Sequence, residues 1–158
     1  MLYVGIDNGL NGGIVVINEK QEVVLKIVMP TIKCKGKTEY DVNSITELFD
    51  DWFGTNVCFA VLEKAHVRPI SGKRACFMNG FGYGLLQGLL NNISYEIISP
   101  QVWMKELGIN SKDEKGSIKY CLKKYPKERW TATERCKKYH DGLTDAACMA
   151  VYCYRRNR

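Results

Sequence analysis

The sequence predicts an α/β domain, and three stretches lead to this prediction. The apolar run 2–6 is closed by Asp7 and a glycine-rich turn, and a second apolar run follows at 14–17, which is the pattern of two paired strands. The near-continuous apolar run 57–62 is typical of a central strand that is covered on both faces. The nine apolar residues at 146–154 fit a core helix, and a chain of 158 residues suits one domain (1–158) with a sizeable core.

The remaining elements follow from local patterns in chain order. A third strand at 23–29 ends at Pro30 and completes an antiparallel meander, whereas the polar residues 31–40 are predicted to form a loop. A short strand is predicted at 95–98, before Pro100. Helices are predicted from a cap at Asp41 or Asn43 to about 53, and at 75–90, 101–107, 112–125 and 141–155.

Composition argues against several classes of protein. No apolar run approaches the ~20 residues that a membrane helix needs, and the chain enters a strand at once without a basic segment. We therefore expect neither a membrane protein nor a signal peptide. The seven cysteines form no CxxC pair, and most of them sit in apolar or helical segments. Reduced thiols of a cytosolic protein explain them better than a disulfide scaffold or a zinc ribbon.

The positive charge is concentrated in one part of the chain. Residues 112–138 hold ten Lys or Arg against four Asp or Glu, an excess of six that equals the net charge of +6 of the whole chain. Trp130 and Tyr139 lie among these cations, a combination that suits phosphate contact and base stacking. The segment indicates an acidic partner such as nucleic acid, although charge alone is equally compatible with a solvated helical face.

Two predicted strands end in a carboxylate. Asp7 closes the strand at 2–6, and Glu63 closes the strand at 57–62. If these strands are neighbours, the two side chains lie together at one edge of the sheet, where like charges repel unless a cation lies between them. The competing interpretation of each residue is an ordinary solvated carboxylate at the end of a strand.

A second pair of carboxylates opens the last predicted helix. Asp141 and Asp145 are four residues apart and share one helix face. A helix cap explains Asp141 well, but Asp145 lies inside the first turn beside core residues, where that explanation is weaker. A cluster of Asp7, Glu63, Asp141 and Asp145 offers only oxygen ligands, which prefer Mg²⁺ or Mn²⁺. Such a set can hold two ions ~4 Å apart and clamp a phosphodiester from both sides.

The predicted helix at 75–90 carries Gly80, Gly84 and Gly88 on one face. Each glycine costs up to ~1 kcal/mol relative to alanine in a helix, so the arrangement calls for a reason. Glycine lets another backbone approach closely. Tight packing on the sheet is the preferred explanation over a ligand contact, and a contact between subunits also fits.

Five segments together resemble the RNase H-like superfamily, and within it the RuvC-type and poxvirus-type Holliday junction resolvases, especially their phage relatives. Each segment is weak alone, but their order and spacing are fairly specific, and they span nearly the whole chain. The segments are GIDNG at 5–9, LEKAH at 62–66, GFGYG at 80–84, SPQVW at 99–103 and HDGLTDA at 140–146.

The resemblance implies a five-stranded mixed sheet flanked by helices. It also implies a phage-encoded, cytoplasmic homodimer whose two sites each nick one strand of a four-way DNA junction with Mg²⁺ or Mn²⁺. By position, Asp7 would bridge two metal ions, Glu63 would bind one, and Asp145 would complete the site. Bacterial RuvC has its two late acids three residues apart, whereas Asp141 and Asp145 are four apart, which leaves open which of the two contacts metal.

The junction-contacting residues that the resemblance implies are cations in two segments. One segment follows Glu63 and the other opens the basic region. They comprise Lys64, His66, Arg68, Lys73, Arg74, Lys112 and Lys115.

Three other functions compete with junction resolution. Another RNase H-like nuclease, acting on RNA–DNA hybrids or flaps, would share the same carboxylates and metal chemistry. An actin-like sugar kinase also begins with a Gly-Ile-Asp-x-Gly hairpin, but it needs two such domains and this chain has room for one. A non-catalytic junction-binding protein is disfavoured, because four acids near DNA weaken binding unless metals neutralise them.

Overall fold

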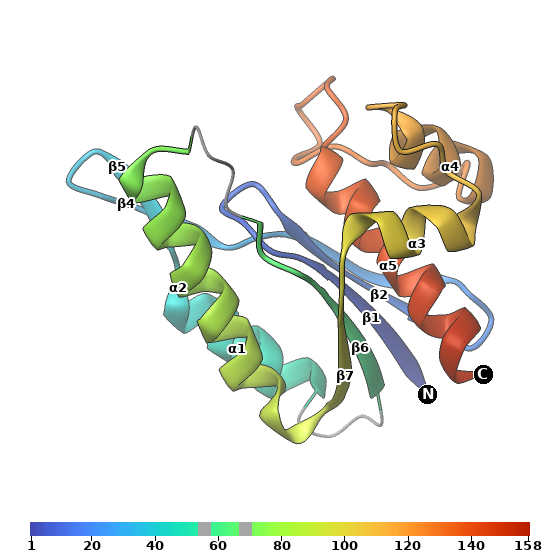
Figure 1. Ribbon diagram of the computed structural model, residues 1–158, viewed down its shortest axis with the longest axis horizontal. Helices are drawn as coiled ribbons and strands as arrows, with labels where there is room; N and C mark the ends of the chain where they lie inside the picture. Colours follow the sequence, from blue (N-terminus) through green and yellow to red (C-terminus); the bar gives the residue numbers. More distant parts are fainter. Residues whose placement is uncertain (54–57, 67–70) are drawn as a thin grey trace.

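The computed structural model describes residues 1–53, 58–66 and 71–158. Its centre is a mixed sheet with the strand order β3-β2-β1-β6-β7 (Figure 1). The first three strands form the predicted antiparallel meander, and β6 and β7 continue the sheet in parallel with β1. The prediction of a five-stranded mixed sheet is confirmed. Its strands are β1 (Leu2–Asp7), β2 (Gly13–Asn18), β3 (Val23–Val28), β6 (Cys58–Glu63) and β7 (Ser94–Ile98).

Helices cover both faces of the sheet (Figure 1). Alternate residues of β1 show why, because Val4 and Ile6 join an apolar cluster with the first two helices, whereas Tyr3 joins a second cluster with the last one. A 3₁₀ turn, η1 (Leu90–Asn92), links the second helix to β7. The helices on the first face are α1 (Val42–Phe53) and α2 (Lys73–Leu89), and those on the second are α3 (Pro100–Leu107), α4 (Gly116–Lys124) and α5 (Asp141–Asn157).

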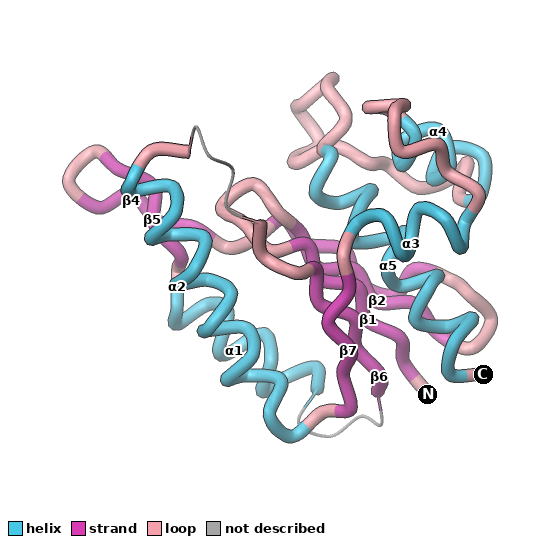
Figure 2. The backbone as a smooth tube through the Cα atoms, in the orientation of Figure 1, coloured by secondary structure: helices cyan, strands magenta, loops and turns pink. Residues whose placement is uncertain are grey.

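The predicted loop at 31–40 is instead a two-stranded hairpin, which lies beside α2 in Figure 2. Its strands β4 (Thr31–Cys34) and β5 (Lys37–Tyr40) pair antiparallel around Lys35 and Gly36, whose φ angles of 48° and 76° suit a tight hairpin turn. The prediction was wrong because these strands are short and largely exposed, so no apolar alternation marks them.

The basic helix begins later than predicted. It starts at Gly116 rather than at Lys112, because two turns precede it. The Asn110 Oδ1 accepts a hydrogen bond from the Lys112 amide at 3.0 Å, and the Asp113 Oδ1 accepts one from the Lys115 amide at 3.1 Å. Side chains of this kind compete with the backbone bonds of a helix and favour turns.

The last helix, α5, lies directly on β1 because glycines stand where the two elements meet. A Cβ atom at Gly5 would overlap the backbone of Ala146 and Ala150 in α5. At the start of the helix, a Cβ atom on Gly142 would lie 2.7 Å from the Gly12 Cα in the β1–β2 turn. These close contacts hold the first turns of α5 against the carboxyl end of β1.

All seven cysteines are free thiols. Two of them, Cys121 and Cys148, are buried between α4 and α5 with their Sγ atoms 4.0 Å apart. Within the described residues, no helix has both the length and the apolar character needed to span a membrane.

Candidate active site

The register of the sheet brings Asp7 and Glu63 together. Ile6 of β1 pairs with Leu62 of β6, so the next residue of each strand stands at the same edge. Both acids point to the α5 face, because Tyr3 and Val61 lie an even number of residues earlier and contact α5 from that face. Asp7 and Glu63 are half-buried, and their carboxyl groups lie within hydrogen-bonding distance of each other.

Burial and neighbouring acids change the acidity of Asp7. Loss of hydration raises the pKa of Asp7 well above its usual range, and the adjacent Glu63 carboxyl raises that pKa further. Asp145 and then Asp141 add smaller repulsive contributions to the same pKa. The four acids named from the sequence therefore act on one another electrostatically at one edge of the sheet.

The first turns of α5 present the other two acids differently. Asp145 is half-buried, and loss of hydration raises its pKa to about 6, with smaller contributions from Glu63 and Asp141. A hydrogen bond from Ser117 of α4 opposes this increase. Asp141 is exposed at the rim of the site.

The cap of α5 is His140 and not Asp141, so the capping interpretation of Asp141 was wrong. The His140 Nδ1 accepts a hydrogen bond from the Leu143 amide at 3.2 Å. Burial lowers the pKa of His140, which keeps the ring neutral and Nδ1 free to accept. Asp141 consequently has no capping task, and its carboxylate faces the solvent.

The set of side chains fits a hard divalent cation by its chemistry. Its members are carboxylates, and their mutual repulsion is what a bound cation would relieve. As the side chains stand, the described residues contain no group of three His, Cys, Asp or Glu already arranged around a common metal position. Asp7 and Glu63 face each other instead, so binding an ion requires their carboxyl groups to turn.

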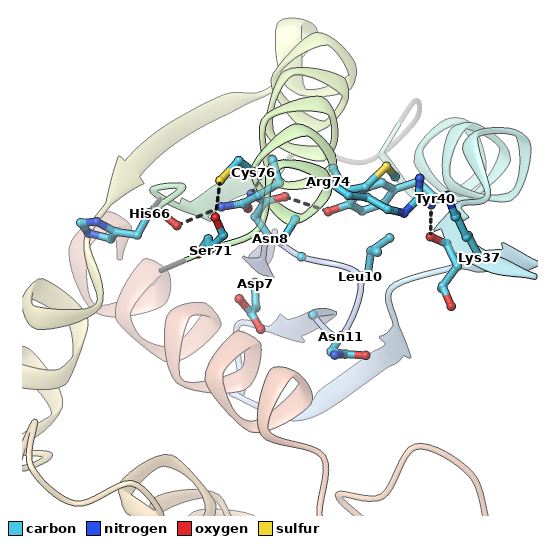
Figure 3. A pocket seen from close by; sticks show the side chains of 16 residues that line it. Asp7, Asn8, Leu10, Asn11, Lys37, Tyr40, His66, Ser71, Arg74 and Cys76 are labelled. Atoms are coloured by element: carbon cyan, nitrogen blue, oxygen red, sulfur yellow. Dashed lines mark hydrogen bonds between the residues drawn. The ribbon is translucent and has the colours of Figure 1, made fainter. Parts of the chain in front are cut away.

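Two pockets flank this edge of the sheet. The larger, of about 760 Å³, extends from Asp7 and the β1–β2 turn to the hairpin and to the first turns of α2 (Figure 3). The smaller, of about 540 Å³, lies between Glu63 and the start of α3 at Pro100. Asn8, His66 and Asn79 line both pockets, so the two form neighbouring parts of one depression.

Two asparagines that the sequence did not single out connect the walls of this depression. The Asn8 Nδ2 donates to the Asn79 Oδ1 at 2.8 Å, and the Asn79 Nδ2 donates to the His66 carbonyl oxygen at 3.1 Å (Figure 3). They tie the turn after Asp7 to α2 and to the segment after Glu63. Their neighbours are the only signal in the sequence, since Asn8 follows Asp7 and Asn79 precedes Gly80.

The predicted DNA-contacting cations surround the depression unevenly. Lys64 and His66 are exposed in the smaller pocket, next to Glu63. Arg74 lines the larger pocket, but its Nη2 donates to the Thr38 carbonyl oxygen and pairs with Glu39 at 3.2 Å, which ties it to the hairpin. Arg68 lies outside the described residues, and the remaining exposed cations are Lys73 at the start of α2 and Lys112 and Lys115 before α4.

The aromatic residues of the basic segment separate into two kinds. Trp130 is fully buried and stacks at a tilt on Tyr125 in the core. The interpretation of Trp130 as a base-stacking residue was therefore wrong, because its ring is inaccessible. Tyr139 is 43% exposed and stays available for such a contact.

Comparison with known proteins bears on the fold. No protein-family model matches the sequence, and a search of curated proteins finds no match. Among solved structures, RuvC of T. thermophilus in complex with a Holliday junction substrate superposes with a TM-score of 0.63 at 12% identity, covering 99% of this chain and 95% of that one. A second Thermus thermophilus RuvC structure gives a TM-score of 0.60 at 14% identity, with 99% and 96% covered. The yeast mitochondrial Holliday junction resolvase Ydc2 gives 0.52 at 16% identity, with 96% and 77% covered. Their agreement with this sheet and its flanking helices shows that the chain has the RNase H-like fold of RuvC-type resolvases.

Proposed function

We propose that this protein is a metal-dependent endonuclease that resolves four-way DNA junctions by paired nicks. The observation that carries the proposal is the meeting of Asp7, Glu63, Asp145 and Asp141 at the carboxyl ends of β1 and β6. The resolvase names of the similar structures point to the same substrate, although identities of 12% to 16% extend the likeness to the fold alone.

The chemistry proposed for the site follows from its ligands. Asp7, Glu63 and Asp145 would hold Mg²⁺ or Mn²⁺, two ions in each site, with Asp141 at the rim. Bound ions supply an activated water and stabilise the charge on the leaving 3′ oxygen. Asp7, as the most buried of these acids by its loss of hydration, would contact both ions. Ser117 would hold the Asp145 carboxylate in place from α4.

The proposed path of the DNA follows the cations around the depression. Lys64 and His66 flank Glu63, and Lys73 and Arg74 stand at the start of α2. Lys112 and Lys115 would contact phosphates from the opposite wall, as would Arg68. Two symmetric nicks need two copies of this site, so the acting unit is proposed to be a homodimer.

A cleavage assay on a panel of substrates tests the proposed function. The panel contains a synthetic four-way junction, its matched linear duplex, a flap and an RNA–DNA hybrid, each with Mg²⁺ and with a chelator. We expect paired nicks in the junction, loss of cutting with the chelator and no cutting of the duplex. A suitable control variant is Asp50→Asn, which alters an exposed acid of α1 and should cut like the wild type.

The other outcomes each select another function. Cutting of the hybrid or the flap in preference to the junction would retain the metal site and replace the substrate. Tight junction binding with no cutting under any metal would identify a junction-binding protein and contradict the proposed mechanism.

A further inference from the structure

One face of α2 is exposed and apolar along its whole length. The large side chains on it are Phe77, which is 69% exposed, and Phe81, which is 44% exposed, with ring centroids 6.5 Å apart. Gly80, Gly84 and Gly88 are exposed on the same side, and at 100° per residue the five positions span about 100° of the helix. We call these five residues the α2 outer strip. Figure 1 shows α2 at the margin of the molecule, running from the hairpin to β7.

The three glycines of the α2 outer strip have no explanation inside the molecule. A Cβ atom at Gly80, Gly84 or Gly88 would meet nothing within 4 Å, so the predicted tight packing on the sheet was wrong for them. Gly82 of the same helix differs, because a Cβ atom there would overlap the Tyr40 ring. Three exposed glycines cost the helix up to ~1 kcal/mol each relative to alanine. A contact that needs a close approach of another chain would offset this cost.

The charge of this face selects the kind of partner. Residues 75–92 contain no Asp, Glu, Lys, Arg or His, in a chain of which 25% is charged. A DNA backbone would find no cation on the strip, whereas an apolar protein surface would find two phenylalanines to cover. Because the molecule carries a net charge of +6, two copies repel each other least across an uncharged face.

The order of residues on the strip makes it complementary to itself. Its large side chains stand at the N-terminal half and its flat glycine positions at the C-terminal half. If two α2 helices cross antiparallel about a two-fold axis between Gly82 and Tyr83, Phe81 faces Gly84 of the partner subunit and Phe77 faces Gly88 of the partner subunit. One axis satisfies both pairs, since each pair is centred on the same point of the helix.

We propose that the α2 outer strip is a homodimer interface, in which Phe77 and Phe81 of each copy pack over the glycines of the other. The inference concerns assembly and stands apart from the proposed function. It has one consequence for that function, because Asn79 of the same helix lines both pockets beside the carboxylates. Pairing through α2 would therefore fix the positions of two sites relative to each other, as paired nicks require.

Sedimentation equilibrium of the purified chain tests the interface without any DNA or metal. We expect the wild type to have twice the 18.0 kDa mass of one chain at tens of micromolar. Phe81→Glu places a charge in the centre of the contact, and Gly84→Leu fills the position that the partner's Phe81 would occupy. Each should weaken dimerisation by about 30-fold or more, the effect of an interface hot spot.

Two comparisons keep the result independent of folding. Gly84→Leu is expected to leave the monomer folded, because a side chain there meets nothing in its own chain and leucine favours helix more than glycine does. Leu122→Glu alters an apolar residue of α4 that is 37% exposed, and it should remain dimeric. Circular dichroism checks that every variant has the wild-type helix content.

The proposal is overturned by either of two results. A wild-type chain that sediments as a monomer at tens of micromolar has no such interface, and loss of junction binding by monomeric Phe81→Glu would then assign the strip to DNA. A wild-type dimer that both Phe81→Glu and Gly84→Leu leave intact is built through another surface. Neither result depends on whether the protein cuts DNA.

Discussion

The two carboxylate pairs of the candidate site are positioned by different means. Asp7 and Glu63 are neighbours because β1 and β6 pair in parallel with Ile6 opposite Leu62, so backbone hydrogen bonds alone set their spacing. Asp141 and Asp145 reach the same edge only because α5 packs on glycines of β1 and of the β1–β2 turn. The strand pair therefore depends on register, and the helix pair depends on a packing contact that lies outside the pair itself.

Asp7→Asn should produce the largest effect, since it removes the acid on which both pairs act. We expect it to lower junction cutting by about three orders of magnitude or more, while junction affinity is retained. Single-turnover cleavage and a binding titration in the presence of Ca²⁺ measure the two quantities. Loss of affinity together with activity would mean that Asp7 has a structural task.

Gly5→Val should break the helix pair without touching any acid. The new side chain would overlap the backbone of α5 at Ala146, and we expect the free energy of unfolding to fall by about 3 kcal/mol or more. Urea unfolding measures the loss. Gly72→Ala, at an open position with an ordinary φ of −65°, should cost less than about 1 kcal/mol. Equal losses in the two variants would remove the packing argument.

The two acids of α5 should separate when each is changed alone. Asp145 is half-buried and interacts with Glu63, whereas Asp141 is exposed at the rim, so Asp145→Asn should lower cutting about 100-fold and Asp141→Asn less than about 10-fold. The rate constants of junction cleavage at saturating Mg²⁺ provide the measurement. A larger loss in Asp141→Asn would assign the metal contact to Asp141.

The raised pKa of Asp145 predicts how stability depends on pH in metal-free protein. Between its ordinary value of 3.8 and its folded value of about 6, the native state binds more protons at Asp145 than the unfolded state does. The contribution of Asp145 to stability is therefore greatest below pH 3.8 and is lost as pH rises through about 6. Asp145→Asn removes this dependence, so its melting temperature relative to wild type should rise from pH 4 to pH 7 in a chelator.

The cap of α5 should produce the smallest effect. His140→Ala removes the acceptor of the Leu143 amide and should cost about 1 kcal/mol at pH 7.5, whereas His140→Asn should restore most of it. Because burial lowers the pKa of His140, the native state binds fewer protons than the unfolded state. The cap is thus fully present above pH 6.5 and is lost as pH falls through the lowered pKa. Urea unfolding at pH 7.5 and pH 5 compares the three proteins, and a cost for His140→Ala that persists undiminished at pH 5 would contradict this account.

The sequence was sufficient for features that local pattern determines. The strands around Asp7 and Glu63 show as apolar runs, and the cap of α1 was among those predicted, since the Asp41 Oδ1 accepts the Ser44 amide at 3.1 Å. The hairpin β4–β5 escaped because its strands are short and exposed. Features set by tertiary contact were beyond reach, including the link from Asn8 to Asn79, which lie 71 residues apart.

The glycines illustrate the same boundary more sharply. Gly5, Gly82 and Gly80 look alike in sequence, yet the first lies against α5, the second against Tyr40 and the third against nothing in its own chain. Only the surrounding fold separates a glycine that permits internal packing from one that faces outward. The burial of Trp130 was hidden for the same reason, because its neighbours in the sequence are charged while its neighbours in space are apolar.

A direct titration with Mn²⁺ tests the central claim, that acids from two strands and one helix form a metal centre. Free Mn²⁺ can be followed by electron paramagnetic resonance in wild type, in Asp7→Asn and in the control Asp50→Asn. We predict that wild type and the control bind up to two ions per chain with equal affinity, and that Asp7→Asn loses this binding. Equal binding by all three proteins, or none by the wild type, would contradict the assignment of Asp7, Glu63 and Asp145 as the metal site.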